Sequence, residues 1–319
     1  MTRPDRTNLP ALALAWHMAG RKVAIATVVD TWGSAPRGVG SMMVVDDTGA
    51  MEGSVSGGCV EGAVITEAMD ALGTGTARLL AYGVSDDDAF AVGLACGGRI
   101  RVLVEPVGPV LPVAVLRDLV AALDARKPVA YVTSLLQSRP AILGDAAQYR
   151  AGIDPDGDRF VAIHTPGLRI VIVGAVHIAQ PLVVMARACG YGVYIVDPRG
   201  SFGSAARFPE DTIIDTWPDE ALQTLGLDAR TAVVTLTHDP KLDDPALYEA
   251  LRSGAFYVGC LGSTRTHGHR VARLRSTGVG EADIARIHGP VGLAIGGRHP
   301  AEIAVSIMAQ ITQILHKPA

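Results

Sequence analysis

Two cysteines stand beside paired glycines, and these residues are the best suited in the chain to bind a metal or an anion. The first lies in Ser56-Gly57-Gly58-Cys59-Val60-Glu61 and the second in Ala95-Cys96-Gly97-Gly98. Adjacent glycines let the backbone bend and bring N–H groups close to a ligand, and a thiol beside such groups ionises more readily. We therefore predict a site for an anionic or metal-bearing ligand. The alternative is a small buried cysteine in each case.

The surroundings of the two cysteines differ. Apolar residues recur at helical spacing from Cys59 to Leu72, which places Cys59 at or just before a helix N-terminus. The unpaired N–H groups and partial positive charge there stabilise a thiolate or a bound anion. Ile100 to Pro106 alternates like a strand, so Cys96 lies in a loop that leads into it. Cys59 is therefore the stronger candidate, and the glycines after Cys96 could simply form a turn.

A second candidate is the loop Thr31-Trp32-Gly33-Ser34-Ala35-Pro36-Arg37-Gly38-Val39-Gly40. Its guanidinium, Arg37, is suited to bidentate phosphate binding, and its glycines allow a close backbone approach. Strand-like runs flank the loop at 23–29 and 42–45. The loop is thus either a phosphate cradle or an ordinary connection between antiparallel strands with a solvated arginine.

A third candidate is the stretch Val171-Ile172-Val173-Gly174-Ala175-Val176-His177-Ile178-Ala179, followed by Asp197 at the end of the next strand-like run. Strand, glycine turn, helix and distal acid form the dinucleotide-binding pattern. Valine at position 176, however, replaces the glycine that lets the backbone approach a pyrophosphate. Gly174, His177 and Asp197 are therefore candidate ligand contacts, and Asp197 could instead cap a turn.

Polar residues also follow two later strand-like runs. His238 lies in Thr237-His238-Asp239, and Ser263 lies in Gly262-Ser263-Thr264-Arg265. Open parallel sheets bind ligands at this edge. His238 is a candidate base or contact residue and Ser263 a candidate phosphate ligand. Strand-end packing or helix capping is the alternative for each.

These runs predict an α/β protein with two domains that meet near Thr165-Pro166-Gly167. Residues 1–166 read as a mixed α/β domain with antiparallel strands. From residue 167 to 319, strands alternate with helical stretches, which indicates a Rossmann-like, doubly wound parallel sheet.

Composition excludes several classes of protein. A net charge of −4 gives no basic excess for nucleic acid. The least charged long stretch, Ile170 to Ala186, is too short and too interrupted to span a membrane. Four cysteines in 319 residues, without C-x-x-C, give neither a disulfide framework nor a paired zinc spacing. We expect a cytoplasmic protein that binds neither nucleic acid nor membrane.

Taken together, the motifs resemble the XdhC/CoxI family of xanthine dehydrogenase accessory proteins, along nearly the whole chain. Any one motif is weak, and their number and order make the resemblance specific. The matching segments are Thr31 to Arg37, Gly57 to Glu61, Cys96 to Gly98, the Gly174 turn, Asp197-Pro198-Arg199, Thr237 to Asp239, Leu261-Gly262-Ser263 and Glu302-Ile303-Ala304. Two positions depart from the family pattern: Val176 replaces a glycine, and His299 stands where threonine is usual.

The resemblance implies a chaperone for the molybdenum cofactor rather than a catalyst. Such a protein binds molybdopterin, holds it while a cysteine desulfurase places the terminal sulfur, and inserts it into a xanthine or aldehyde dehydrogenase. It implies that Cys59 binds the cofactor and contacts molybdenum, with Cys96 as a second wall. Thiolates are soft ligands that suit a sulfur-rich metal centre, and Arg37 with the N–H groups of the glycine pairs would hold the phosphate. A homodimer is also expected.

Two other functions remain open from the residues. The strand–turn–helix unit with Asp197 would suit an NAD(P)-dependent oxidoreductase, against which Val176 counts. A non-catalytic scaffold that joins a desulfurase to its target hydroxylase is the third possibility.

Overall fold

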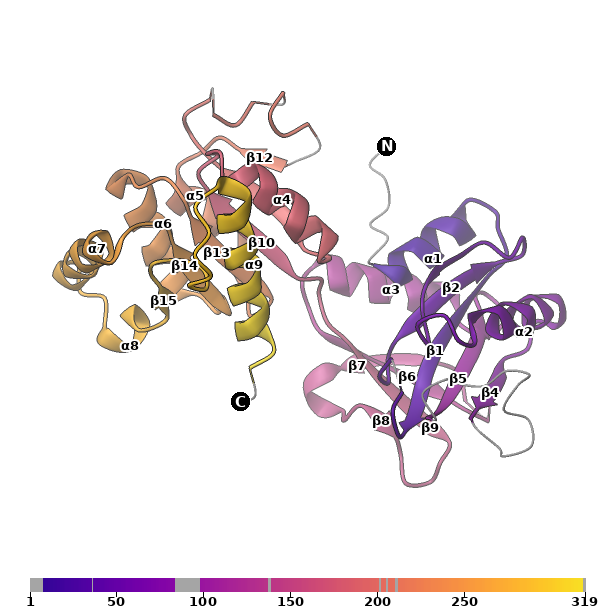
Figure 1. The fold of residues 1–319 in the computed structure, drawn as a ribbon. Coiled ribbons are helices and arrows are strands. Elements are labelled where there is room, and N and C mark those ends of the chain that lie inside the picture. The colour runs from indigo at the N-terminus through magenta and orange to yellow at the C-terminus, as the bar shows by residue number, and fades with distance from the viewer. Residues whose placement is uncertain are drawn as a thin grey trace. The chain divides into compact units, whose positions relative to one another are not determined.

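The structure is a computed structural model of the 319-residue chain (Figure 1). It describes residues 8–35, 37–83, 98–136, 139–200, 202–204, 206–209 and 212–317. Cys96 and Gly97 lie outside the described residues. The chain forms two compact units, Met1–Pro166 and Gly167–Ala319, and each is described by itself below.

The first unit is built on an antiparallel five-stranded sheet. Its strands lie in the order β3-β2-β1-β5-β4. The central strand, β1, is rich in β-branched residues and is buried from Val23 to Val29. That burial on both faces explains its continuous apolar run. The bounds are β1 Val23–Trp32, β2 Met42–Asp46, β3 Met51–Gly53, β4 Arg78–Tyr82 and β5 Arg99–Pro106.

Helix α2 (Glu61–Thr74) covers one face of this sheet with a stripe of small apolar residues, Val64, Ala68 and Ala71. The other face packs on α1 (Leu9–Met18), α3 (Val113–Asp124) and a second sheet in the order β7-β6-β9-β8. The second sheet consists of β6 Val129–Ser134, β7 Ile142–Asp145, β8 Gly152–Ile153 and β9 Arg159–His164, with a short 3-10 turn at Ala146–Gln148.

Glu105 joins the two sheets of the first unit from a buried position. Its Oε1 accepts hydrogen bonds from the Tyr131 hydroxyl and from Thr133 Oγ1, each at 2.8 Å. Burial raises the pKa of the Glu105 carboxyl, and the two hydrogen bonds lower it by less. The folded state therefore holds this proton more tightly than the unfolded state does.

We expect Glu105 to make unfolding pH-dependent in a definite direction. Because its folded pKa is raised, its contribution is most favourable below the unfolded value of 4.5 and is lost as pH rises above that value. Glu105→Gln keeps the acceptor oxygen and removes the titration, so its stability should fall less between pH 5 and pH 8. Urea unfolding at both pH values measures this, and equal losses in the two proteins would contradict it.

The second unit contains a six-stranded, wholly parallel sheet in the order β12-β11-β10-β13-β14-β15. The direction of winding reverses between β10 and β13, as in the doubly wound dinucleotide-binding folds. This confirms the Rossmann-like sheet. The strands are β10 Arg169–Val173, β11 Gly192–Val196, β12 Thr212–Ile214, β13 Thr231–Thr235, β14 Tyr257–Cys260 and β15 Ile287–His288.

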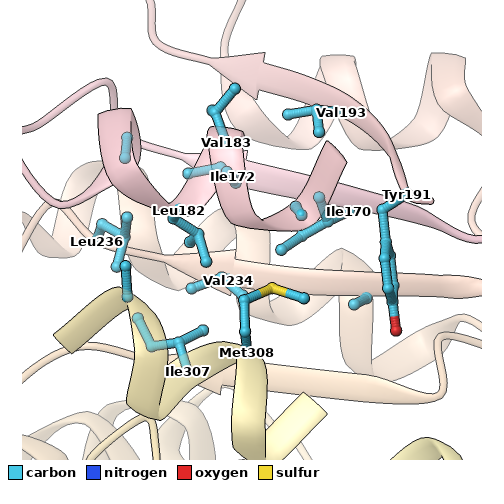
Figure 2. Close-up of a cluster of buried hydrophobic side chains, with 14 of the residues drawn as sticks. Ile170, Ile172, Leu182, Val183, Tyr191, Val193, Val234, Leu236, Ile307 and Met308 are labelled. Atoms are coloured by element: carbon cyan, nitrogen blue, oxygen red, sulfur yellow. The ribbon is translucent and has the colours of Figure 1, made fainter. Parts of the chain in front are cut away.

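Helices cover both faces of the parallel sheet. On one face, Leu182 of α4 (Ala179–Ala188) and Ile307 and Met308 of α9 (Pro300–Leu315) pack over Ile170 and Ile172, as Figure 2 shows. The other face carries the apolar sides of α5 (Pro218–Leu225) and α6 (Pro240–Arg252). Helices α7 (Thr264–Ser276) and α8 (Glu281–Ile284) complete the unit. Within the described ranges, no helix combines the length and apolarity needed to cross a membrane.

Candidate functional site

Cys59 lies in the loop that connects β3 to α2, two residues before the helix begins at Glu61. Its side chain is exposed, which rules out the alternative of a small buried cysteine. Gly57 has a φ of 78° and Gly58 a φ of 114°, and both values lie in the left-handed region that side chains disfavour. The glycine pair is therefore required by the backbone path that presents Cys59.

Glu61 holds this loop in shape. Its Oε1 accepts from Ser54 Oγ at 2.6 Å and from the Ser56 N–H at 2.9 Å. Its Oε2 accepts from Ser56 Oγ at 2.5 Å and from the Gly58 N–H at 2.9 Å. Burial alone would raise the pKa of this carboxyl, but the hydrogen bonds from Ser54 and Ser56 outweigh burial and bring the pKa down to about 2. Glu61 is thus a fixed anion at the base of the loop.

The loop N–H groups are engaged within the loop. Gly57 donates to Ser54 Oγ at 2.9 Å, and the N–H groups of Cys59 and Val60 both donate to Ser56 Oγ at 3.0 Å. We expected the glycine N–H groups to face an anion, and the structure corrects this. Their donors satisfy the carboxylate and hydroxyls of their own chain, so the ligand-facing group that the loop offers is the Cys59 thiol.

The loop that contains Arg37 connects β1 to β2. Val28 donates to the Ser41 carbonyl and Gly40 donates to the Val28 carbonyl, each at 2.8 Å. Arg37 is exposed. The hairpin connection that the sequence left as an alternative is thus present, and it leaves the guanidinium accessible to a ligand.

Gly98 brings the second cysteine motif against the Arg37 loop. A Cβ atom on Gly98 would lie 3.0 Å from the carbonyl carbon of Ser34 and 3.1 Å from the Ala35 nitrogen, so a side chain here would crowd the backbone of the Arg37 loop. Ala35 in turn packs against the cluster that contains Val55, Val60 and Ile100. The cluster links the Arg37 loop to the Cys59 loop, and Gly98 contacts the Arg37 loop at Ser34.

Gly174 ends β10 at the point where the winding of the second sheet reverses. Its φ is 106°, and a Cβ atom there would lie 2.5 Å from Thr237 Cγ2. The glycine is therefore required both by its conformation and by the close approach of the strand-end loop of β13. This contact brings together two of the predicted segments of the second unit, the Gly174 turn and Thr237-His238-Asp239.

Asp197 is occupied by its own chain. Its Oδ2 accepts from the Ala175 N–H at 2.8 Å, and Arg199 binds both carboxylate oxygens, at 2.9 and 2.8 Å. Burial raises the pKa of Asp197, but the hydrogen bonds from Arg199 and Ala175 lower it more. Both groups that a bound dinucleotide would use, the turn N–H and the strand-end acid, thus bind each other. Val176 is half-buried against the core.

The remaining predicted residues of the second unit lie at the carboxyl edge of its sheet. His177 and His238 are exposed, and His238 has a φ of 62°, an uncommon conformation for a side chain of its size. Ser263 is the N-cap of α7, and its Oγ accepts from the Thr266 N–H at 3.1 Å. Ser263 therefore serves the capping role that the sequence left open.

Sequence reasoning missed the residues that brace both sites. Glu61 was not predicted to support the loop, although a serine five residues before a carboxylate in the first helical turn can indicate such a support. Arg270 and Asp243 are buried beneath the strand-end loops of β13 and β14. Their burial could not be predicted, because an arginine in a polar helix is expected to be exposed to solvent. No group of three or more His, Cys, Asp or Glu residues suited to a metal occurs in the described part of the chain.

The structure thus defines a class: a two-unit α/β protein with an exposed cysteine on a braced loop in one unit and a Rossmann-type sheet in the other. Residues 170–311 match the family description "XdhC Rossmann domain", and residues 16–83 match "XdhC and CoxI family". The chain belongs to the XdhC and CoxI family.

Known proteins are similar in sequence to this chain over nearly its full length. The chain is 30% identical to the molybdenum cofactor insertion chaperone PaoD of Escherichia coli, over 98% of this chain and 90% of PaoD. It is 28% identical to a probable subunit of xanthine dehydrogenase from Bacillus subtilis, over 92% of this chain and 93% of that protein. A crystal structure named as a xanthine dehydrogenase from Bacillus halodurans matches with a TM-score of 0.78 and 27% identity, over 97% and 96% of the two chains.

Proposed function

We propose that this protein is a chaperone that binds the molybdenum cofactor and delivers it to a molybdenum enzyme. The observation that carries the proposal is the exposed Cys59, presented by a glycine loop that Glu61 braces. Full-length similarity to a chaperone named for cofactor insertion supports it.

The chemistry of a carrier fits this arrangement. A carrier must hold its cargo and later release it, which favours an exposed group on a rigid support over a closed cage of ligands. Thiolates are soft ligands for a sulfur-rich molybdenum centre, and the exposed Cys59 thiol would contact the metal. Arg37 is accessible on a neighbouring loop and would bind the cofactor phosphate. We include Gly98 because it seats its segment against that loop. Cys96 and Gly97 remain predictions.

The finer steps follow from the same proposal. The chaperone would hold the cofactor while a cysteine desulfurase adds the terminal sulfur, and then pass it to a hydroxylase of the xanthine or aldehyde dehydrogenase type. It would act in the cytoplasm and as a homodimer. In the second unit, Gly174, His177, Asp197, His238 and Ser263 remain proposed cofactor contacts, at the edge where open parallel sheets bind ligands.

An NAD(P)-dependent activity has support from the strand order of the second sheet. Against it stand Val176 and the engagement of Asp197 by Arg199 and Ala175. Titration with NADH and NADPH separates the two functions, and saturable binding would favour the oxidoreductase.

Replacing Cys59 tests the proposal. We expect Cys59→Ala, purified from a host that makes molybdopterin, to carry at least about tenfold less pterin, because losing even a partner of a metal ligand weakens such sites tenfold or more. Cys189→Ala is the matched control, since Cys189 is also exposed but lies in the second unit. Oxidation to the fluorescent pterin product gives the amount. Equal pterin in both variants would contradict the role of Cys59.

A further inference from the structure

A pocket of about 550 Å³ lies at the end of the first sheet where β1, β5 and β4 meet. Its volume is within the range of small-molecule sites. Only Trp32 among its residues lay in a candidate segment chosen from the sequence, the loop from Thr31 to Gly40. They are Asp30, Trp32, Ala81, Tyr82, Gly83, Arg99, Ile100 and Arg101.

Strand register places the charged and aromatic members of this pocket on one face. Asp30 pairs with Arg101, and Trp32 pairs with Arg99. Side chains two residues apart on a strand share a face, so these four lie together. Ile100 lies between the two arginines and packs on the opposite face, against the cluster beneath α2. The strand register shifts between Val28 and Asp30, and such irregularities re-aim side chains near binding sites.

One wall of the pocket is a preformed stack of an indole and a guanidinium. Trp32 is 70% exposed, which is unusual for so large an apolar side chain, and the guanidinium carbon of Arg99 lies 5.6 Å from the centre of its ring. Gly83 makes room for this stack, because a Cβ atom there would lie 2.6 Å from Arg99 Cγ. Gly83, the residue after β4, therefore packs directly against the stem of Arg99.

The charges of the pocket are available to a ligand. Among the residues that the structure describes, neither Arg99 nor Arg101 has an ion-pair partner, although Asp30 stands opposite Arg101 in the strand register. Two guanidinium groups without an ion-pair partner among the described residues suit a phosphate. The Asp30 carboxylate lines the same pocket and can accept hydrogen bonds from the edge of a ligand ring that carries N–H donors. Flat ring, anionic tail and donor edge are together the features of a phosphorylated pterin.

We propose that this pocket binds the pterin and phosphate of the cargo. The proposal rests on the function proposed above. The pterin ring stacks on Trp32, its amino-pyrimidine edge donates to Asp30, and the phosphate lies on Arg99 and Arg101, which take the place of the Arg37 contact proposed above. The pocket thus supplies the recognition of the organic part of the cargo, which a cysteine thiol cannot.

Tryptophan fluorescence of the full chain, titrated with oxidised 6-hydroxymethylpterin phosphate, tests the pocket directly. We expect the pterin to quench Trp32, so the quenched fraction disappears in Trp32→Phe and persists in Trp217→Phe, a half-exposed tryptophan of the second unit. Arg101→Ala should weaken binding at least about tenfold, the loss expected for a charge-assisted bond to phosphate. Arg117→Ala, an exposed arginine of α3, should leave it unchanged.

Two further arms keep the test sharp. Gly83→Ala displaces the stem of Arg99 without removing a charge, and it should weaken binding with the fold intact by circular dichroism. AMP carries a phosphate on a different ring, and quenching by AMP at the same concentration would overturn the assignment to a pterin. Unchanged titrations for both Trp32→Phe and Arg101→Ala would overturn the pocket itself.

Loading in a host that makes molybdopterin separates this inference from the function on which it rests. Pterin on the wild type and its loss from Cys59→Ala, with wild-type amounts on the Trp32 and Arg101 variants, would overturn the pocket and leave the chaperone standing. If the wild-type chain carries no pterin, the proposed chaperone function is overturned, whatever the fluorescence titration shows. Reduced pterin on both pocket variants supports the pocket.

Discussion

Glu61→Gln is expected to destabilise the first unit by roughly 3 kcal/mol at neutral pH and to abolish retention of the cargo. The pKa of Glu61 falls from 4.5 to about 2 on folding, and each unit of such a shift corresponds to about 1.4 kcal/mol. A glutamine side chain would also place N–H donors against the Ser56 hydroxyl or the Gly58 N–H, which are donors themselves. The loop that presents Cys59 would then lose its shape.

The same carboxylate sets the acid limit of stability. Because its folded pKa is lowered, its contribution is complete above pH 4.5 and is lost as pH falls from 4.5 toward 2. Denaturant unfolding at pH 7 and pH 3 should show a much smaller difference for Glu61→Gln than for the wild type. Glu67→Gln is the control, since Glu67 lies on the same helix in a partly exposed pair with Arg78, a type of pair that contributes little. Equal effects of the two substitutions would contradict the role of Glu61.

Arg270→Met is expected to destabilise the second unit by about 3–5 kcal/mol, the usual result of leaving a buried charge unpaired. Arg270 is 2% exposed, and its Nη2 donates to the Leu261 carbonyl at 2.9 Å. The same nitrogen lies 3.7 Å from Oδ2 of Asp243, which is also buried. Asp243 in turn accepts from Thr237 Oγ1 at 2.6 Å. The pair therefore supports the strand-end loops that carry His238 and Ser263.

A double variant separates the buried charge from lost packing. Asp243→Asn keeps an acceptor for Thr237 and removes the negative charge, so Asp243→Asn combined with Arg270→Met should be more stable than the sum of the single losses predicts. The free energy of unfolding of all four proteins gives the coupling. Strict additivity would show that the two side chains do not act as an ion pair.

The long, strongly apolar elements of this chain could be predicted from sequence. Run 23–29 and the stretch before Gly174 became the interior strands β1 and β10, because burial on both faces leaves a nearly continuous apolar signal. The alternating run 100–106 became β5. Short edge strands carried no such signal. β4, β7 and β8 mix polar and apolar residues, and none of these three strands was predicted.

The candidate site was predicted in part. The helical spacing of apolar residues after Cys59 located it before a helix. The glycine pair marked the loop, because positive φ at two successive residues favours glycine. The engagement of the loop N–H groups by Ser54, Ser56 and Glu61 depends on three-dimensional geometry that residue spacing does not carry. The pocket depends on register between strands far apart in the sequence, as with Asp30 and Arg101. Such pairings are set by tertiary packing rather than by local pattern.

Transfer of the cargo is the most direct test of the chaperone. The full chain, isolated with pterin from a host that makes molybdopterin, is mixed with a molybdenum hydroxylase that lacks its cofactor. Pterin on each protein is then measured after separation, together with hydroxylase activity. We predict that pterin leaves the chain, appears on the hydroxylase in equal amount and restores activity, and that Cys59→Ala supplies none. Pterin that stays on the wild-type chain while the hydroxylase remains inactive would contradict the proposed function.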